Sequence, residues 1–270
     1  MATKPLIDVR TEAETRAKFI LDEGIDLVQR RLYAGAKSAE HNPDFDVGFM
    51  LARDIATGLH TLQTQFRPNK AMNEDENKPI EIFLSTFGGD LYSAFGIYDL
   101  LRVSPVPIHV YVFGQCMSAG TVIMQGAEKR FVSKSSRLMI HYGSTTDEGT
   151  SNPVRVDEVW KEHREIMDEM VEIYMTRCNK ELLAERRAKK VLEEFSKGWP
   201  MSNRKKKQYM QNYNVEALAE EALRKDILPI ESYFVAKRFV ELGLADEIVT
   251  KPPPKKDPFA PIVADEASSG

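Results

Sequence analysis

Residues 80–127 of the chain are "IEIFLSTFGGDLYSAFGIYDLLRVSPVPIHVYVFGQCMSAGTVIMQGA" and decide the fold. Two short apolar runs, 80–85 and 107–114, have the length and composition of buried strands. Each run is followed by a segment with helical spacing, 90–104 and 118–127. A strand followed by a helix and another strand is the pattern of a βαβ unit with parallel strands. The stretch therefore predicts an α/β fold of repeated βαβ units around a mainly parallel sheet.

The flanking sequence continues this alternation toward the N-terminus. Residues 11–23 and 44–66 have the apolar spacing of helices, and residues 26–36 between them have the composition of a strand. Residues 67–79 are polar and predict a loop. The N-terminal part is thus interpreted as belonging to the same α/β architecture.

The second half of the chain is more charged and predicts helices. Residues 153–195 form one long helix or two in series, with an apolar stripe that is interpreted as packing. The stripe comprises Val159, Ile166, Met170, Ile173 and Met175. A basic turn at 204–207 and two shorter helical patterns, 215–225 and 231–242, follow. Residues 251–270 are rich in proline and then in small and acidic residues, and predict a flexible tail.

Composition narrows the classes of function. The chain has 270 residues, of which 42% are hydrophobic, so it can bury a large core. Its formal net charge of -4 gives no general attraction to nucleic acid or to an anionic membrane, and neither partner is expected. Charges interrupt the N-terminal segment where a leader needs an apolar run, and the two cysteines lack metal-ligand spacing. We therefore expect a cytoplasmic protein that uses no metal or other cofactor.

One serine and one histidine stand at the ends of predicted strands. Ser118 lies where a strand gives way to a helix, and Gly88 and Gly89 occupy the corresponding turn after the preceding strand. Helix N-termini at such turns present N–H groups, and two N–H groups from neighbouring turns can form an oxyanion hole. His141 ends a third strand-like run and is a natural base for a serine hydroxyl. The set indicates nucleophilic acyl transfer.

Each of these residues also has an ordinary structural interpretation. Serine is a favoured helix N-cap, double glycine is a common turn, and a histidine at the end of an apolar strand is usually a satisfied core residue. Cys116, two residues before Ser118, is interpreted as a packing residue because nothing near it in the sequence would lower its pKa. The order and spacing of the motifs favour the catalytic interpretation.

Three motifs, "FLSTFGGDLYSAFGIYD", "VFGQCMSAGTVIMQGAEKRF" and "SRLMIHYG", resemble the core motifs of the Clp-type serine proteases, the ClpP proteolytic subunit and its relatives. The resemblance implies a ClpP/crotonase-like fold with a long protruding helix. It also implies that Ser118 is the nucleophile, that His141 is the base, and that the N–H groups of Gly89 and Ala119 form the oxyanion hole.

The same resemblance implies an organisation and partners. A ClpP-like domain would span residues 25–250, with a helical insertion at about 180–212, between an N-terminal segment, 1–24, and the tail, 251–270. The chain would be an ATP-dependent endopeptidase that forms a tetradecamer of two stacked heptameric rings. The rings would enclose the serines, and a ring ATPase unfoldase would supply peptide or unfolded protein substrates.

Two features depart from the family pattern. Tyr142 and Gly143 follow His141, where the family usually has glutamine and proline. The family's catalytic aspartate falls on Ile227 without a gap, and a single-residue insertion brings Asp226 into register. We expect Asp226 to orient His141. Substitution by Glu231, or a dyad with a backbone acceptor, stays open.

Two other classes of function also stay open. The chain could be a non-proteolytic structural subunit of a Clp-like ring, or a crotonase-type acyl-CoA enzyme with similar βα architecture and glycine oxyanion holes. Neither class needs both Ser118 and His141. Modification by a serine-directed reagent would separate a protease from both.

Overall fold

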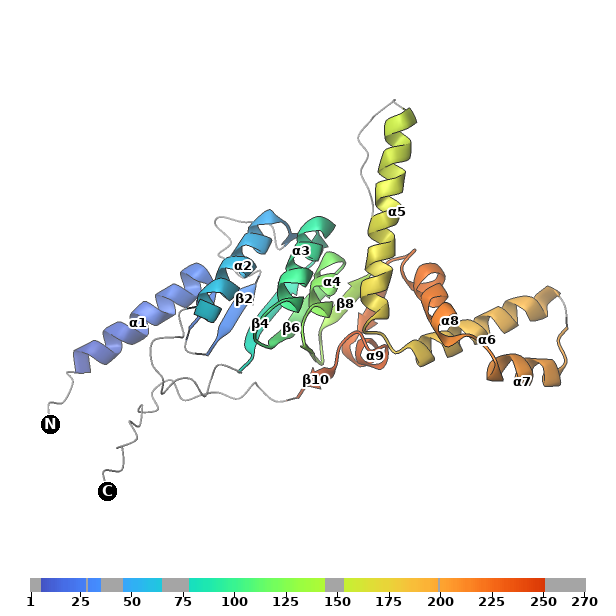
Figure 1. Ribbon diagram of the computed structural model, residues 1–270. Helices are drawn as coiled ribbons and strands as arrows, with labels where there is room; N and C mark the ends of the chain where they lie inside the picture. Colours follow the sequence, from blue (N-terminus) through green and yellow to red (C-terminus); the bar gives the residue numbers. More distant parts are fainter. Residues whose placement is uncertain are drawn as a thin grey trace, which may run out of the picture.

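A mainly parallel sheet forms the centre of the molecule (Figure 1). The computed structural model describes residues 6–27, 29–34, 46–64, 78–143, 153–198 and 200–250. The sheet has eight strands in the order β1-β2-β4-β6-β7-β10, with β8 paired to β6 and β9 paired to β8. These strands are β1 (Ile25–Asp26), β2 (Arg31–Ala34), β4 (Ile80–Thr86), β6 (Ile108–Met117), β7 (Lys129–Ser133), β8 (Arg137–Ile140), β9 (Ser232–Val235) and β10 (Glu247–Val249).

The strand pairing confirms the predicted fold class. All pairs in the large sheet are parallel except β1 with β2 and β8 with β9. The short strands β3 (Asp46–Val47) and β5 (Gly88–Gly89) form a separate parallel pair. The units β4-α3-β6 and β6-α4-β7 are the βαβ units that residues 80–127 predicted.

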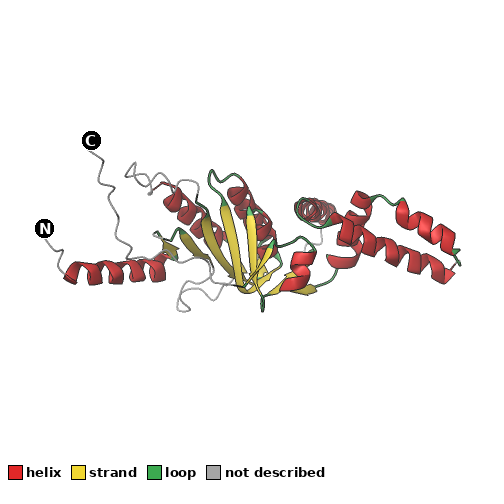
Figure 2. Cartoon of the chain, turned by 90° about the horizontal axis from the view of Figure 1, so that it is seen from below, coloured by secondary structure: helices red, strands yellow, loops and turns green. Residues whose placement is uncertain are grey.

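Helices cover one face of this sheet (Figures 1 and 2). They are α2 (Phe49–Thr64), α3 (Leu91–Arg102) and α4 (Ala119–Gln125). Alternate residues of β4 are buried, which is the period-two pattern of a strand with one face against the core. All seven residues of α4 are buried, so the helix that follows Ser118 is held on every side.

The opposite face of the central strands carries a row of aromatic rings. Tyr33, Phe83, Tyr111 and Phe131 are paired in register across β2, β4, β6 and β7. Successive ring centroids in this row lie 5.1, 5.3 and 4.6 Å apart. Stacked cross-strand pairs of this kind help to fix strand register.

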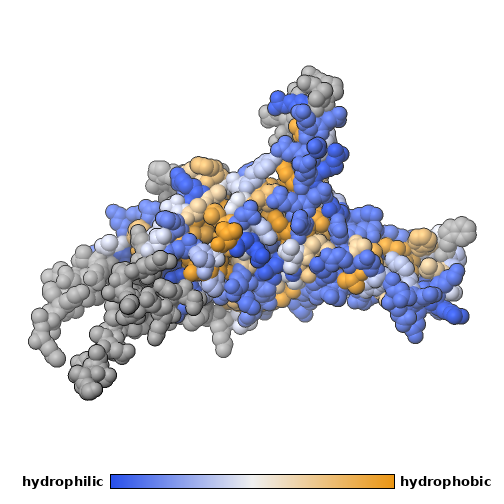
Figure 3. Space-filling view, viewed as in Figure 1, coloured by the Kyte–Doolittle hydropathy of each residue, from blue (hydrophilic) through white to orange (hydrophobic). Residues whose placement is uncertain are grey.

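The long helix α5 (Pro153–Met175) projects from the body, as the resemblance implied (Figure 1). Its C-terminal part joins the core, where Met170 and Tyr174 are almost completely buried. On the face seen in Figure 3, hydrophobic residues gather near the foot of α5, whereas its shaft is largely hydrophilic. The predicted apolar stripe therefore packs mainly at its C-terminal end.

The remaining helices lie at the two ends of the chain. The helix α1 (Leu6–Glu23) precedes β1, and Nη2 of Arg16 holds it there by donating to both carboxylate oxygens of Asp26, at 2.8 and 2.7 Å. Beyond α5 come α6 (Lys180–Gly198), α7 (Asn203–Gln211), α8 (Val215–Ala222), the π-helix η2 (Leu223–Ile227) and α9 (Ala236–Glu241). The helices expected between 180 and 212 are therefore present as α6 and α7.

The strand expected at 26–36 is present over 31–34 as β2, which also pairs antiparallel with the short strand β1. Two other local predictions were wrong. The helix expected at 231–242 begins only at α9, because residues 232–235 pair with β8 as a strand. The basic cluster 204–207 lies on α7 and not in a turn. The tail 251–270 lies outside the described residues.

Candidate active site

Ser118 occupies a strained position between β6 and α4. Its backbone has φ 49° and ψ −127°, and it is one of two non-glycine residues with positive φ among the described residues. Such conformations cost about 1–3 kcal/mol and are common at active sites. The Ser118 N–H donates to the carbonyl of Met139 at 2.7 Å. A sharp strand-to-helix turn of this kind exposes a serine hydroxyl at the carboxyl end of a parallel strand.

The side chain of Ser118 does not cap the helix. It makes no capping hydrogen bond to α4, although Ser118 is the N-cap residue. Its Oγ lies 2.8 Å from Nε2 of His141 instead. The ordinary interpretation of this serine as a cap therefore does not describe its hydroxyl.

His141 reaches Ser118 because β8 lies beside the end of β6. The two strands are parallel and Met117 pairs with Met139, so their carboxyl ends meet at the same edge. His141 directly follows Ile140, the last residue of β8. The structure thus brings together the two residues that the sequence proposed as nucleophile and base.

The Gly88–Gly89 turn packs directly against Ser118. A Cβ atom at Gly88 would lie 2.6 Å from Cβ of Ser118 and 3.2 Å from the nitrogen of Ala119. The backbone φ of Gly88 and Gly89, 106° and 144°, is also a conformation that favours glycine. The two candidate oxyanion donors, Gly89 and Ala119, therefore belong to backbone turns in close contact.

A hydrogen bond to Thr86 holds the Gly88–Gly89 turn. Its Oγ1 accepts the N–H of Gly88 at 3.0 Å, and its side chain is completely buried. On the other side, a Cβ at Gly89 would lie 2.3 Å from the carbonyl oxygen of Val47, so β3 presses against the turn. The glycine turn is fixed from both sides.

Asp226 is held by a different part of the molecule. Its carboxylate accepts a hydrogen bond from Arg187 Nη1 at 3.3 Å and another from Lys190, both on α6. Among the described residues, the imidazole of His141 is hydrogen-bonded to Ser118 alone. The two segments nevertheless run side by side, because the N–H of Tyr142 donates to the carbonyl of Leu228 at 2.9 Å. The structure brings the Asp226 segment beside His141 but turns its carboxylate toward α6.

Glu231 also has a partner of its own. Its carboxylate accepts the Tyr233 hydroxyl at 2.9 Å on the exposed side of β9. Neither acid that the sequence proposed touches the imidazole in this structure, so the third member of a triad stays a prediction.

Cys116 is a packing residue, as predicted. Its side chain has no exposed surface, and burial raises the pKa of its thiol. A buried thiol with a raised pKa has little thiolate and is a poor nucleophile. The second cysteine, Cys178, is also free, and burial raises its pKa to about 11.

Two polar residues behind Ser118 were missed at the sequence level. Thr121 Oγ1 donates to the carbonyl of Ser118 at 2.7 Å, and the hydroxyl of Tyr174 lies 2.7 Å from the same Oγ1. Tyr174 belongs to α5, about 50 residues further along the chain, so no local motif connects it with the serine. A threonine three residues after the serine was the one available signal.

Among the described residues, no three His, Cys, Asp or Glu side chains are grouped so that they could hold a metal ion. None of the helices in the described ranges combines the length and apolar character needed to cross a membrane.

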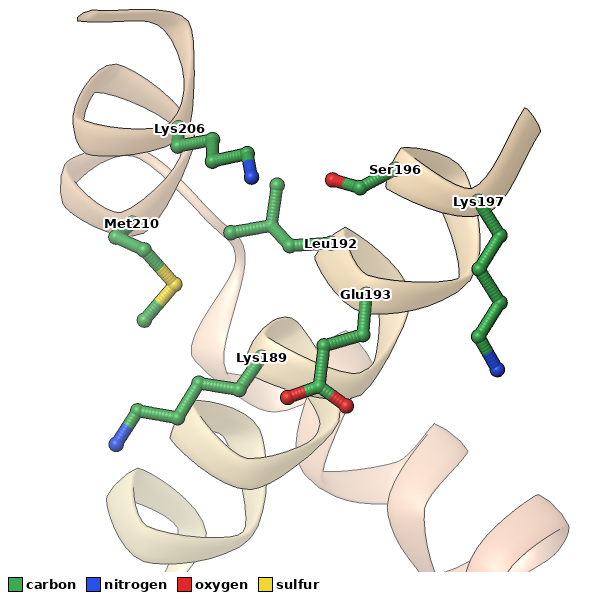
Figure 4. A pocket seen from close by; sticks show the side chains of 7 residues that line it. All are labelled: Lys189, Leu192, Glu193, Ser196, Lys197, Lys206 and Met210. Atoms are coloured by element: carbon green, nitrogen blue, oxygen red, sulfur yellow. The ribbon is translucent and has the colours of Figure 1, made fainter. Parts of the chain in front are cut away.

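A groove of about 510 Å³ lies between α6 and α7, in the segment expected as an insertion (Figure 4). Three lysines border it, and Leu192 and Met210 supply apolar surface. In Figure 4 the side chains of Lys206 and Ser196 point toward one another across Leu192. No residue of the Ser118 site lines this groove, so it is separate from the candidate chemistry.

Comparison with known proteins identifies a family. The family model for Clp protease matches residues 70–209, which include Ser118 and His141. The chain is 30% identical over 104 residues to an ATP-dependent Clp protease proteolytic subunit of Deinococcus radiodurans, covering 38% of this chain and 50% of that protein. It is 33% identical over 87 residues to ATP-dependent Clp protease proteolytic subunit 2 of Chlamydia trachomatis, covering 32% of this chain and 43% of that protein.

A solved structure has the same fold. A mutant of ClpP1 from Listeria monocytogenes matches with a TM-score of 0.53 at 17% identity, covering 83% of this chain and 94% of that one. The sequence matches to the two curated relatives span half of their length or less.

Proposed function

The chain belongs to the Clp protease family, and we propose that it is a serine endopeptidase in which Ser118 attacks the peptide bond. The observation that carries the proposal is the 2.8 Å contact between Ser118 Oγ and His141 Nε2 at a strained turn. A helix N-cap serine would direct its hydroxyl to the helix, and a satisfied core histidine would not need a serine partner.

The proposed reaction is acyl transfer. His141 Nε2 accepts the proton of Ser118 as Oγ attacks the substrate carbonyl carbon. The N–H groups of Gly89 and Ala119 stabilise the negative oxygen of the tetrahedral intermediate. His141 then gives the proton to the leaving amine as the C–N bond breaks. A water molecule, deprotonated by His141, releases the acyl group from Ser118 in the second half of the reaction.

Asp226 is the proposed orienting acid, and this role requires its carboxylate to exchange its present partners for His141. The carboxylate would have to leave Arg187 and Lys190 and turn toward the other nitrogen of His141. The backbone hydrogen bond between Tyr142 and Leu228 supports this role, because it holds the Asp226 segment beside His141 and the carboxylate has only a short distance to move. A Ser118–His141 dyad is the alternative.

The test is hydrolysis of a fluorogenic peptide, with inactivation by a serine-directed phosphonate. A serine protease should cut the peptide and lose activity in proportion to phosphonate incorporated. A structural ring subunit or an acyl-CoA enzyme of the crotonase type should do neither. Turnover of an acyl-CoA thioester without peptide hydrolysis would overturn the proposal.

The proposed assembly is a tetradecamer of two heptameric rings joined through α5. The projecting helix supports this, because Trp160 on its shaft is 55% exposed, and large exposed aromatic residues often mark interfaces. Light scattering at high protein concentration should give the mass of fourteen chains, and a monomer alone would reject the rings. Enclosed serines should cut small peptides faster than folded proteins.

The proposed partner is a ring ATPase unfoldase, which would make degradation of folded proteins ATP-dependent. Adding such an ATPase with ATP should increase the cleavage of a folded substrate and leave small-peptide cleavage largely unchanged. An equal effect without ATP would argue against an unfoldase partner.

A further inference from the structure

The carbonyl of Ser118 accepts two hydrogen bonds from one residue. Thr121 donates to it through its backbone N–H at 2.8 Å and through Oγ1 at 2.7 Å. A carbonyl oxygen has two lone pairs, so both are occupied. The N–H of the same serine is bound to Met139, as described above, so the backbone of Ser118 is held at both ends.

Tyr174 completes this arrangement from α5. A threonine hydroxyl has a single hydrogen, which Thr121 directs to the Ser118 carbonyl, so the Tyr174 hydroxyl is the donor in its 2.7 Å contact with Thr121 Oγ1. Both side chains are completely buried. Burial raises the pKa of the Tyr174 hydroxyl, which therefore keeps its proton and remains a donor.

We propose that Thr121 and Tyr174 are positioning residues that orient the N–H of Ala119 in the oxyanion hole. The carbonyl of Ser118 and the N–H of Ala119 belong to the same peptide unit. Because that unit is planar and trans, its C=O and N–H point in opposite directions. Fixing the carbonyl toward Thr121 therefore fixes the direction of the Ala119 N–H. This inference rests on the proposed function only for its kinetic consequence.

The position of the pair supports a role beyond packing. Valine would fill the space of Thr121 without a hydroxyl, and phenylalanine would fill that of Tyr174 without its oxygen. The two hydroxyls instead satisfy each other and a backbone carbonyl in a region with no exposed surface. Hydrogen bonds in a buried chain also polarise one another. The Ala119 N–H is therefore a stronger hydrogen-bond donor, because the Ser118 carbonyl of the same peptide accepts two bonds.

The same threonine connects to a wider polar network, in which Gln125 and Arg130 are buried. Gln125 Nε2 donates to the carbonyl of Thr121 at 3.0 Å, and Gln125 Oε1 accepts from Arg130 at 2.5 Å. Arg130 in turn binds both carboxylate oxygens of Asp246. The first turn of α4 is thus anchored at the hydroxyl of Thr121, at its carbonyl and through α5.

The test compares Thr121→Val, Thr121→Ser and Tyr174→Phe with the wild-type chain. For Thr121→Val we expect kcat for a small peptide to fall about tenfold or more with KM changed less than about twofold, because an oxyanion donor acts in the transition state. Tyr174→Phe should lower kcat by about threefold to tenfold. Thr121→Ser retains the hydroxyl and should restore most of the activity.

A matched control is available in the turn directly after α5. Thr176 Oγ1 also donates to a carbonyl three residues earlier, that of Ile173, at 2.7 Å, and it lies on the exposed surface. Thr176→Val removes the same kind of bond away from Ser118 and should leave kcat unchanged. Equal losses of kcat in Thr176→Val and Thr121→Val would overturn the proposal, and so would wild-type kcat in Thr121→Val.

A crystal structure of Thr121→Val gives a readout that does not depend on activity. We expect the Ser118–Ala119 peptide to rotate away from its present orientation, φ 49° and ψ −127° at Ser118. An unchanged peptide would overturn the positioning role. A wild-type enzyme that neither cuts peptides nor reacts with the phosphonate would instead reject the proposed function, and the crystal structure would still decide the orientation.

Discussion

The turn at Ser118 and the π-helix at Asp226 both carry residues that the sequence assigned to catalysis, and they are held in different ways. Ser118 is fixed by buried backbone and hydroxyl bonds within the sheet and α4. Asp226 is 19% exposed and is held by side-chain ion pairs to α6. A buried hydrogen-bonded turn has one geometry, whereas the ion pair of Asp226 with the half-exposed Lys190 is weak and exchangeable, although Arg187 itself is buried. The fold therefore fixes the geometry of the nucleophile, whereas the position of the Asp226 carboxylate depends on its ion pairs with α6.

The largest expected effect follows substitution of Ser118. Ser118→Ala should lower kcat for peptide hydrolysis by about 10⁵-fold to 10⁶-fold, because the nucleophile is removed. The fold should be unchanged, since Ser118 makes no capping bond and alanine keeps Cβ. Circular dichroism and light scattering should match the wild-type chain. Wild-type turnover in the alanine variant would reject Ser118 as the nucleophile.

The second prediction tests the role of Asp226. If Asp226 orients His141 during the reaction, Asp226→Asn should lower kcat by about ten-thousandfold without changing the turn at Ser118. Loss of its ion pair with Arg187 should also reduce the free energy of unfolding by about 1 kcal/mol.

Two control variants separate these effects. Glu221→Gln removes another carboxylate that Arg187 binds, at 3.1 Å, and should lower stability but not kcat. Glu231→Gln should change neither by much. A loss of kcat only in Glu231→Gln would move the role to that residue. Full activity in both Asp226→Asn and Glu231→Gln would favour the dyad.

The sequence predicted the first of these regions well for a physical reason. Ser118, Gly88 and Gly89 lie at strand-to-helix turns within 80–127, and local patterning determines such turns. The parallel pairing of β6 with β8 then brings His141 to the same edge. The sequence could identify these positions because each depends on a strand end.

The second region could not be predicted in the same way. The side-chain direction of Asp226 depends on Arg187 and Lys190, which are 39 and 36 residues away on α6. Tyr174 is likewise separated from Thr121 by 53 residues. Residues 232–235 pair with β8 as a strand, although their local pattern predicts a helix. Tertiary contacts of this kind override local propensity.

The third prediction concerns the ion pair between the buried Arg130 and the partly exposed Asp246 behind α4. Asp246→Asn should lower the free energy of unfolding by about 3 kcal/mol, because Arg130 would lose its charged partner while its side chain is only 4% exposed. Glu247→Gln, at an exposed neighbouring position, should have little effect. Urea denaturation measures both. An equal stability for Asp246→Asn and the wild-type chain would show that the network contributes little.

The same ion pair predicts a pH dependence. Burial by itself raises the pKa of Asp246, but the bonds from Arg130 outweigh it and hold that pKa below its ordinary value of 3.8. A depressed carboxyl pKa contributes stability that is fully present above the unfolded-state value and is lost as pH falls through the folded-state value. The stability difference between the wild-type chain and Asp246→Asn should therefore shrink below about pH 4. A difference that stays constant to lower pH would contradict this assignment.

The smallest expected effect is on α7. This helix has no buried residues, whereas α6 buries Leu183, Ala184, Arg187 and Ala188, so removing all of 180–212 would open the core. Replacing Lys205, Lys206 and Lys207 together by Glu tests the segment without that damage. Peptide turnover should change less than about twofold and stability by less than about 0.5 kcal/mol. Loss of phosphonate labelling at Ser118 would contradict a role outside the chemistry.

The central claim is that Ser118 is the nucleophile and that His141 activates it. Its most direct test is to locate the phosphonate adduct by peptide mapping and mass spectrometry in the wild-type chain and in His141→Ala. The account predicts a single adduct on the peptide that contains Ser118, formed at least about a hundredfold more slowly in His141→Ala. An adduct on another serine, or equal rates of labelling in the two proteins, would contradict it.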